Sequence, residues 1–231
     1  MSFVTIDNVS KAYGANGAAV PVLRGVSEQV REGEFVCLMG PSGSGKSTLL
    51  TVVGAMNHPS EGRLVVDGID VYGLSDEARA DFRREYLGFV FQQHHLMPYL
   101  TAAENVMLPL ATMKLASSEK RGRAAAALER VGLADKGKRL PGELSGGEQG
   151  RVAIARALVN DAPLILADEP TGALDTQTGR EVMAVFLTLR AQGQTIFVVT
   201  HNTENAALAD RTIHIRDGRL CREQEPTVAG R

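Results

Sequence analysis

The stretch that decides the fold is Phe35-Val-Cys-Leu-Met39, which runs directly into Gly40-Pro-Ser-Gly-Ser-Gly-Lys-Ser47 and then into Thr48-Leu-Leu-Thr-Val-Val53. The first run is continuously apolar and predicts a buried β-strand, whereas the last predicts a helix. Between them lies Gly-x-x-x-x-Gly-Lys-Ser, whose glycines permit a loop with backbone N–H groups that converge on a phosphate. The N-terminus of the following helix adds its positive end. The sequence therefore predicts an α/β fold with a phosphate-binding loop.

Two side chains of this loop have specific expected roles. Lys46 can reach the β- and γ-phosphates of a nucleotide as a point charge, and the Ser47 hydroxyl can ligate Mg²⁺. A glycine-rich turn followed by a chance Lys-Ser is the alternative, but the strand before it and the helix after it make that coincidence rare. The candidate nucleotide-binding residues are Gly40, Pro41, Ser42, Gly43, Ser44, Gly45, Lys46, Ser47 and Thr48.

The composition is that of an ordinary globular protein. The 231 residues suit one compact domain, or one domain with an inserted subdomain; 44% of them are apolar and 23% are charged. A formal net charge of -2 gives no support for bulk electrostatic binding to nucleic acid or to an anionic bilayer. The two cysteines, Cys37 and Cys221, argue against a disulfide framework and favour a reducing cytosol.

The sequence contains no signal that would place it in a membrane. The first residues form neither a basic leader nor a long apolar segment, so we expect no signal peptide. No window reaches the roughly 18 consecutive apolar residues that a membrane-spanning helix needs. We expect any membrane role to come through a partner.

Strand signals occupy the two ends of the chain. The apolar runs Leu164–Ala167 and Thr195–Thr200 are expected to be strands buried on both faces of a mostly parallel sheet. Short β-rich runs such as Val4–Val9 and Leu64–Val66 precede them, with glycine turns between. A terminal hairpin is expected around Asp217-Gly218, because Asp-Gly favours a tight turn.

Helix signals occupy the middle. Thr101-Ala-Ala-Glu104 and Ser145-Gly-Gly-Glu148 both fit the capping box that opens a helix. The segment Ser118–Val131 is rich in helix formers, and Gly132 is placed to end it. The expected division is a helical subdomain, residues 93–160, within an α/β core, residues 1–92 and 161–231.

Acidic and histidine side chains follow two of the expected core strands. Since parallel strands end at one edge of a sheet, Asp168, Glu169 and His201 are expected beside the phosphate loop. Asp168 would hold Mg²⁺, and Glu169 would orient and deprotonate the attacking water. His201 is a candidate contact for the γ-phosphate. An acidic pair is as often a solvated loop, and a single histidine is more often structural.

The segment Leu144-Ser-Gly-Gly-Glu-Gln149 resembles half of a phosphate site. Ser145 as N-cap leaves Gly146 and Gly147 in the first helical turn, with no side chains to shield their N–H groups. Such an anion site without a lysine or a metal ligand is incomplete. Two copies arranged head to tail would place each helix start on the nucleotide of the other copy. An ordinary helix start with flexible glycines is the alternative.

Six motifs taken together resemble the nucleotide-binding subunit of an ABC transporter over essentially the whole chain. They are Gly40–Ser47, Gln92, Leu144–Gln149, Leu164–Glu169, Ala173-Leu-Asp175 and His201. The resemblance implies a RecA-like P-loop NTPase core with a mostly parallel sheet, antiparallel β pieces in the N-terminal part and an inserted helical subdomain. It implies ATP and Mg²⁺ as cofactors, with ATP hydrolysis coupled to transport.

The resemblance also implies residue roles that neither spacing nor periodicity gives. Tyr13 would stack on adenine, Gln92 would sense Mg²⁺ and the γ-phosphate, and Asp175 would communicate across the dimer. His201 would be the switch histidine. Ser145, Gly146, Gly147, Glu148 and Gln149 would form the signature segment that acts in trans, and Ser47, Gln92 and Asp168 would serve the metal.

Within that family, three segments resemble one branch, which contains lipoprotein-releasing ATPases, macrolide and peptide exporters and the cell-division subunit. These segments are Gly88–Pro98, Glu104–Leu110 and Leu166–Asp175. The likeness implies export or release of a lipoprotein, lipid, peptide or drug-like substrate. The alternative is an ATPase that powers a non-transport membrane complex, such as a cell-division or envelope-remodelling machine.

Gly150 departs from the family pattern, because relatives usually carry glutamine there. We expect Gly150 to lie inside an exposed helix, where glycine is less favourable than alanine by roughly 1 kcal/mol. The departure would then loosen the signature helix slightly.

The expected partners are a second copy of the chain, forming an ATP-sandwich homodimer, and a transmembrane permease that docks near Gln92 and Leu96–Leu100. The alternative for Leu96-Met-Pro-Tyr-Leu100 is that it belongs to the core of the insert. The expected location is cytoplasmic, peripheral on the inner face of the membrane, with no nucleic acid bound. Relatives that act on DNA or ribosomes carry long coiled coils or tandem cassettes. An inactive regulatory subunit would not need Glu169 and His201, and a small-molecule kinase would not need the second anion site.

Overall fold

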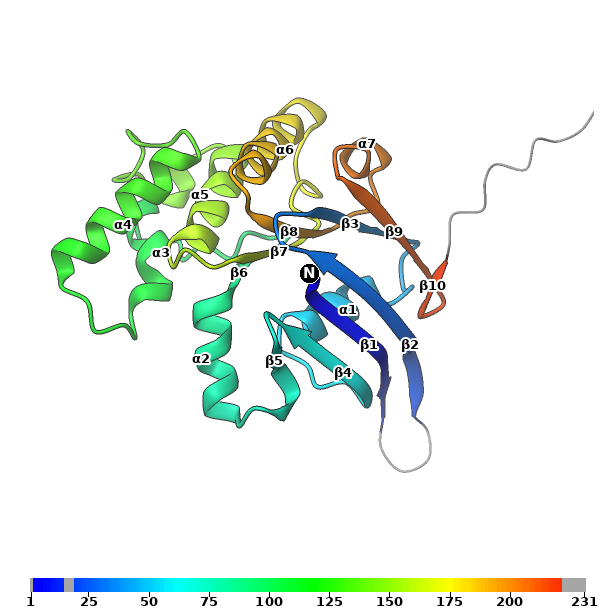
Figure 1. Ribbon diagram of the computed structural model, residues 1–231. Helices are drawn as coiled ribbons and strands as arrows, with labels where there is room; N and C mark the ends of the chain where they lie inside the picture. The colour runs from blue at the N-terminus through cyan, green and yellow to red at the C-terminus, as the bar shows by residue number, and fades with distance from the viewer. Residues whose placement is uncertain (1, 15–18, 222–231) are drawn as a thin grey trace, which may run out of the picture.

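Residues 2–14 and 19–221, which the computed structural model describes, form two β-sheets with helices packed around them (Figure 1). The strands are β1 (Ser2–Tyr13), β2 (Val20–Arg31), β3 (Phe35–Met39), β4 (Glu61–Val66), β5 (Ile69–Asp70), β6 (Leu87–Val90), β7 (Leu164–Asp168), β8 (Thr195–Val199), β9 (Arg211–Arg216) and β10 (Arg219–Cys221). The α-helices are α1 (Lys46–Val53), α2 (Asp76–Tyr86), α3 (Ala102–Met107), α4 (Ser117–Arg130), α5 (Gly146–Leu158), α6 (Thr176–Ala191) and α7 (Thr203–Ala206). The short 3₁₀ helices are η1 (Val71–Gly73), η2 (Leu108–Leu110) and η3 (Pro141–Glu143).

The central sheet has the strand order β10-β9-β3-β8-β7-β6 and is parallel except for β10, which pairs antiparallel with β9. The second sheet is antiparallel, with the order β2-β1-β4-β5. The predicted mostly parallel core with antiparallel strands in the N-terminal part is therefore confirmed. So is the terminal hairpin, since Arg219 pairs with Arg216 across Asp217 and Gly218.

The central strands are continuously apolar because both of their faces are buried. In β3, Phe35 and Cys37 join one hydrophobic cluster with α3, α4, α5 and α6, while Val36 and Leu38 join another with α1, α2 and the antiparallel sheet. Strands β7 and β8 alternate between the two clusters in the same way. The central sheet is therefore the middle layer of the molecule (Figure 1).

The helices between β6 and β7 begin close to where the sequence predicts, and α4 ends at the predicted glycine. Both predicted capping boxes are present, at Thr101 with Glu104 and at Ser145 with Glu148. Helix α4 ends before Gly132, whose φ of 72° is the left-handed conformation that commonly follows a helix. Within the described ranges, no helix combines the length and the apolar character that crossing a bilayer requires.

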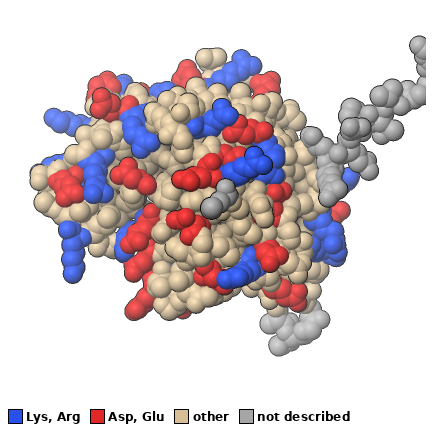
Figure 2. Space-filling view, viewed as in Figure 1, with Lys and Arg blue, Asp and Glu red and all other residues tan. Residues whose placement is uncertain are grey.

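The expectation that Gly150 lies on an exposed helix surface is wrong. Gly150 is buried on α5, between the imidazole of His94 and the side chain of Val182 on α6. Helix α5 is covered on several sides, because it packs against α3, α4, α6 and β6. On the face shown in Figure 2, basic and acidic side chains are interspersed among uncharged residues.

The contact between α5 and β6 predicts opposite effects of one substitution at two glycines. A Cβ at Gly88 would lie 2.2 Å from the carbonyl oxygen of Ala157 and 2.6 Å from Cδ1 of Ile165. Gly88→Ala should therefore lower the free energy of unfolding by roughly 1–3 kcal/mol. Gly122 lies exposed on α4 with no neighbour within 4 Å of an added Cβ. Gly122→Ala should raise that free energy by about 0.5–1 kcal/mol.

Urea unfolding followed by circular dichroism measures both changes. If both substitutions changed the free energy of unfolding by the same amount, the close contact at Gly88 would be contradicted. The two sites differ in the space available for the added methyl group.

Candidate functional site

Four strand ends of the central sheet meet at one cavity of about 780 Å³. The phosphate loop follows β3, Gln92 follows β6, Asp168 and Glu169 lie at the end of β7, and His201 follows β8. The residues that line the cavity are Val22, Gly40, Pro41, Ser42, Gly43, Gly45, Lys46, Ser47, Thr48, Gln92, Asp168, Glu169 and His201. The structure therefore brings together most residues that the sequence placed around a nucleotide.

The phosphate loop is wedged between strands of both sheets, and glycine is required where the contact is closest. A Cβ at Gly40 would lie 2.2 Å from the carbonyl oxygen of Ile215 on β9. Gly45 has a φ of 104°, and its Cβ would lie 2.9 Å from the carbonyl oxygen of Val22 on β2. The side chain of Ser44 is buried beneath the loop and does not line the cavity.

The start of α1 faces the cavity as an anion-binding site. Its N-cap, Gly45, has no side chain that could accept from the first N–H groups of the helix. Lys46 lies across the loop, where its ammonium group donates to the carbonyls of Gly40 and Pro41 at 2.8 and 2.9 Å. Free helical N–H groups and a lysine in one cavity are suited to phosphate oxygens.

Ser47 and Asp168 form the oxygen-rich side of the cavity. The Ser47 hydroxyl donates to a carboxylate oxygen of Asp168 at 3.4 Å. Burial raises the pKa of Asp168 and Glu169 adds to the rise, whereas the Ser47 hydroxyl and Lys46 lower it. A cation beside Asp168 would favour the ionised form, so the carboxylate and hydroxyl fit Mg²⁺, which prefers oxygen ligands. Among the described residues, no group of three or more His, Cys, Asp or Glu side chains could hold a metal on its own.

Glu169 is held in a strained backbone conformation and paired with His201. Its φ is 47°, in the left-handed region, and its N–H donates to the carbonyl of Val199 at 2.9 Å. Its carboxylate lies 2.8 Å from Nδ1 of His201 and accepts the backbone N–H of His201 at 3.4 Å. The Glu169 side chain is 14% exposed and that of His201 is 70% exposed. The carboxylate is thus oriented from two directions at the mouth of the cavity.

Gln92 lies against the turn that follows Glu169. A Cβ at Gly172 would approach the side-chain nitrogen of Gln92 to 2.9 Å, so glycine there leaves room for the amide. The N–H of Gly172 donates to the carbonyl of Glu169 at 2.9 Å. Gln92 and Glu169 are therefore parts of one packed arrangement.

Tyr13 and the signature segment do not line this cavity. Tyr13 ends β1, where its hydroxyl accepts from the side-chain amide of Asn57 and the ammonium group of Lys11 lies 5.1 Å from its ring centroid. Ser145 and Gly146 are exposed at the start of α5. The second anion site is separate from the first within one copy of the chain.

The side chains of the signature segment hold the start of α5 in place. Ser145 and Glu148 cap each other, with distances of 3.2 and 2.8 Å, and the Ser145 backbone N–H lowers the pKa of Glu148. Gln149 donates to the carbonyls of Pro141 and Leu144. With these polar groups engaged, Ser145 and Gly146 remain the exposed part of the helix start.

Asp175 is the N-cap of α6, and it positions a residue that the sequence analysis did not include. Its carboxylate accepts from the Thr178 backbone N–H at 3.0 Å and from the Thr178 hydroxyl at 2.5 Å, and these bonds lower the pKa of Asp175. The methyl group of Thr178 lies 2.3 Å from where a Cβ on Gly147 would stand. The Asp-x-x-Thr spacing is a helix-cap signal, but the contact with Gly147 is tertiary. Val22 of β2 lines the cavity and was also not predicted, because its contact with the phosphate loop is tertiary.

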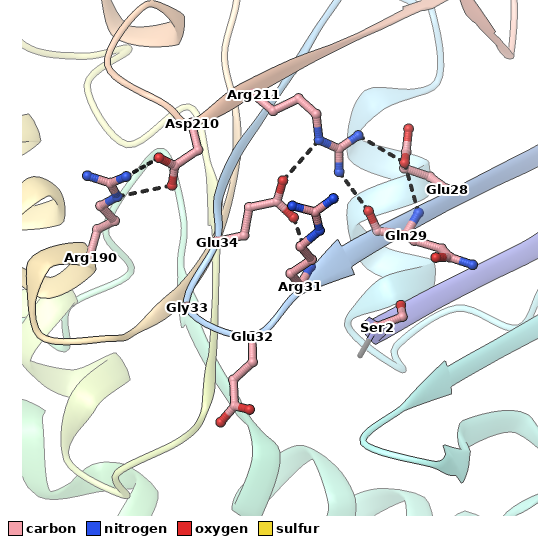
Figure 3. A pocket seen from close by; sticks show the side chains of 10 residues that line it. All are labelled: Ser2, Glu28, Gln29, Arg31, Glu32, Gly33, Glu34, Arg190, Asp210 and Arg211. Atoms are coloured by element: carbon pink, nitrogen blue, oxygen red, sulfur yellow. Dashed lines mark hydrogen bonds and ion pairs between the residues drawn. The ribbon is translucent and has the colours of Figure 1, made fainter.

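A larger cavity of about 850 Å³ lies at the opposite end of the sheet (Figure 3). Two of the arginines that line it are already paired: Arg211 bonds Glu28 and Glu34, and Arg190 bonds Asp210. These bonds tie β2, β3, β9 and α6 together. The cavity therefore fits a structural role better than ligand binding.

Comparisons with known proteins agree with this arrangement. The family model described as ABC transporter matches residues 23–172. An uncharacterised ABC transporter ATP-binding protein of Bacillus subtilis is 47% identical over 98% of this chain and 99% of its own length. The macrolide export ATP-binding/permease protein MacB of Sodalis glossinidius is 47% identical over 94% of this chain, which spans only 33% of that protein. A solved dimer of an ATP-binding cassette in a post-hydrolysis state, bound to ADP and Pi, superposes with a TM-score of 0.86 at 43% identity, covering 96% of this chain and 98% of that one.

The contact between Gly147 and Thr178 predicts a compensating pair of substitutions. Gly147→Ala should lower the free energy of unfolding by roughly 1–3 kcal/mol, since the added methyl group overlaps that of Thr178. Thr178→Ser in the same chain should restore most of the loss, because serine lacks the methyl group and keeps the hydroxyl that bonds Asp175. A double-mutant cycle by thermal unfolding measures the coupling.

Gly146→Ala is the matched control. Its Cβ would meet only the end of the Leu174 side chain, at 3.1 Å, which can move aside. A loss at Gly147 that Thr178→Ser does not reduce would show that the methyl contact is not the cause.

Proposed function

Because this chain belongs to the ABC transporter family and is an ATP-binding, ATP-hydrolysing subunit of it, we propose that two copies close around ATP and thereby drive a separate membrane permease. Each copy binds ATP in the cavity beside Lys46, and the start of α5 in the other copy completes the site.

The observation that carries this proposal is the division of the anion sites. One copy offers a phosphate loop in the cavity and a second, exposed helix start at Ser145 and Gly146 that does not line it. A two-fold arrangement lets both helix starts be used at once. The similar solved structures support it, since two of them are dimers of ATP-binding cassettes.

In the proposed reaction, backbone N–H groups of the loop and Lys46 hold the phosphates, and Tyr13 stacks on adenine. Glu169 accepts a proton from the attacking water, and His201, 2.8 Å from that carboxylate, keeps it oriented. Ser47, Gln92 and Asp168 would hold Mg²⁺, which would supply charge neutralisation for the phosphates when bound. Ser145 and Gly147 of the other copy face the γ-phosphate, with Gly146, Glu148 and Gln149 shaping that helix start, and Asp175 lies at the dimer interface.

Attack of water on the γ-phosphorus breaks its bond to the β–γ bridging oxygen and yields ADP and phosphate. The γ-phosphate then no longer links the two copies, so the dimer opens. Gln92 lies between the α/β core, residues 1–92 and 161–231, and the helical insert, residues 93–160. The state of the nucleotide therefore changes the tilt of the insert relative to the core.

The permease is proposed to dock on the insert next to Gln92. Met97 is 52% exposed and Tyr99 is 90% exposed, whereas Leu96 and Leu100 are partly buried and anchor the segment. Two exposed apolar side chains on an anchored loop suit a helix of a partner protein. Docking there places the chain at the inner face of the membrane. The relatives named for macrolide export support an exporter or a releasing system.

Glu169→Gln should lower the turnover of ATP by roughly 100-fold or more, because the amide cannot accept the proton. Binding of ATP should be unchanged, and dimers should accumulate in the presence of ATP. Phosphate release and size-exclusion chromatography measure the two effects. Hydrolysis at the parent rate would remove Glu169 from the role of base.

Mixing two inactive variants tests whether the site is shared. Lys46→Ala disables the phosphate loop, and Ser145→Arg disables the helix start. A 1:1 mixture should recover about a quarter of the parent rate, because half of randomly paired dimers are mixed and each holds one intact site out of two.

Two controls define the result. Each variant alone should be inactive, and Ser145→Arg should bind ATP as the parent does. Full activity of Ser145→Arg alone would contradict capping by the second copy.

A further inference from the structure

The segment after Gln92 folds back onto α5 through two histidines in the left-handed conformation. His94 has a φ of 58° and His95 a φ of 47°, and the His94 side chain is buried. Left-handed backbone is unfavourable for residues other than glycine. Two such residues in succession persist only where their surroundings hold them.

Arg156 of α5 holds this turn. Its guanidinium donates to the carbonyl of His94 at 2.5 Å and to that of His95 at 2.7 Å. The planar guanidinium offers its donors in a fixed geometry, so it fixes the orientation of both peptide groups. The loop beyond Gln92 is thereby tied to the signature helix by its backbone.

The His94 ring occupies the space that Gly150 leaves free on the same helix. Its Cε1 lies 3.4 Å, and its Nε2 3.7 Å, from where a Cβ of Gly150 would stand, and Val182 lies 3.5 Å away on another side. Within the described structure, the buried Nδ1 has no hydrogen-bond partner, and burial lowers the pKa of His94. The ring therefore fills the space between Gly150 and Val182.

The rest of the loop is pinned to α3. Asn105 is fully buried, and its side chain accepts from the N–H of Met97 and donates to the carbonyls of Met97, Leu100 and Thr101. From Gln92 to the start of α3, the chain is therefore fixed to both helices. A displacement of Gln92 would therefore be transmitted through the loop to α3 and α5.

We propose that His94 is a positioning residue whose ring, seated between Gly150 and Val182 and held by Arg156, makes the Gln92 loop and the start of α5 move as one body. We call the contact of His94 with Gly150 and Arg156 the His94 seat. This inference rests on the proposed ATP-driven closure, because it concerns how a change at Gln92 reaches the helix start that caps the other copy's nucleotide.

Removing the ring tests the proposal. His94→Ala should lower kcat roughly tenfold or more, because the helix start is no longer placed accurately on the γ-phosphate. The affinity of the monomer for ATP should stay within about twofold, since the ring does not line the nucleotide cavity. Steady-state hydrolysis and equilibrium binding of a fluorescent ATP analogue separate the two quantities. A residue with only a structural role would change the unfolding temperature without this split.

A size exchange provides the matched controls. Gly150→Gln should lower kcat as His94→Ala does, because its side chain competes with the ring for the same space. The double variant with both changes should recover most of the activity, since the glutamine fills the gap left by the ring. Gly150→Ala should stay active, because its Cβ makes ordinary contact with His94 at 3.4 Å. His94→Phe should stay active too, because it keeps a flat ring of similar size in this space while it loses both ring nitrogens.

The outcomes separate this inference from the proposed function. If the parent, with Glu169→Gln introduced, forms no dimer on ATP, the proposed function fails. If it does dimerise but His94→Ala keeps the parent kcat, or the double variant shows no recovery, the His94 seat is refuted. Inactivity of a folded His94→Phe would show that the nitrogen, rather than the shape of the ring, is what matters, and would also overturn the proposal.

Discussion

Burial of the central sheet on both faces constrains where this molecule can place polar chemistry. Strands such as Val36–Leu38 in β3 and Ile196–Val198 in β8 have no face in contact with water. A polar side chain there would be buried without a partner. Functional groups are therefore confined to the points where strands end, and parallel strands end together. The meeting of the phosphate loop, Asp168, Glu169 and His201 at one cavity follows from that confinement.

The phosphate loop lies between the two sheets, with β2 of the antiparallel sheet on one side and β9 of the central sheet on the other. Val22 on β2 and Ile215 on β9 approach Gly45 and Gly40 so closely that no side chain fits. At the opposite end, Arg211 bonds Glu28, Gln29 and Glu34 and thereby holds β2 to β3 and β9 (Figure 3). The two sheets are thus joined by ion pairs at one end and by close backbone packing at the other, and the loop between them is packed against strands of both.

The strands and helices that the sequence analysis named are present, because the signals that set them are local, but helices α2 and α6 were not predicted. The run Phe35–Met39 and the capping box at Thr101 depend only on neighbouring residues, and both occur as expected. The boundaries were less accurate: β1 extends over Ser2–Tyr13 instead of Val4–Val9, since pairing with two other strands lengthens it. What could not be predicted depends on contacts between distant segments. Gly150 is buried because His94, more than fifty positions earlier, folds over it, and no period in the sequence carries that information.

The placement of the anion sites has an energetic consequence for a shared nucleotide. If ATP lies between the phosphate loop of one copy and the helix start of another, its γ-phosphate contributes to the interface itself, so binding and association are linked. Loss of that phosphate then lowers the affinity of the two copies for each other. Such a switch requires that the helix start be rigid relative to the loop that detects the phosphate, since a flexible link would let the dimer stay closed after hydrolysis. Three features fix α5 in its surroundings: the capping box at Ser145, the contact of Gly147 with Thr178 and the His94 seat. The nucleotide would therefore act by changing the position of α5 as a whole.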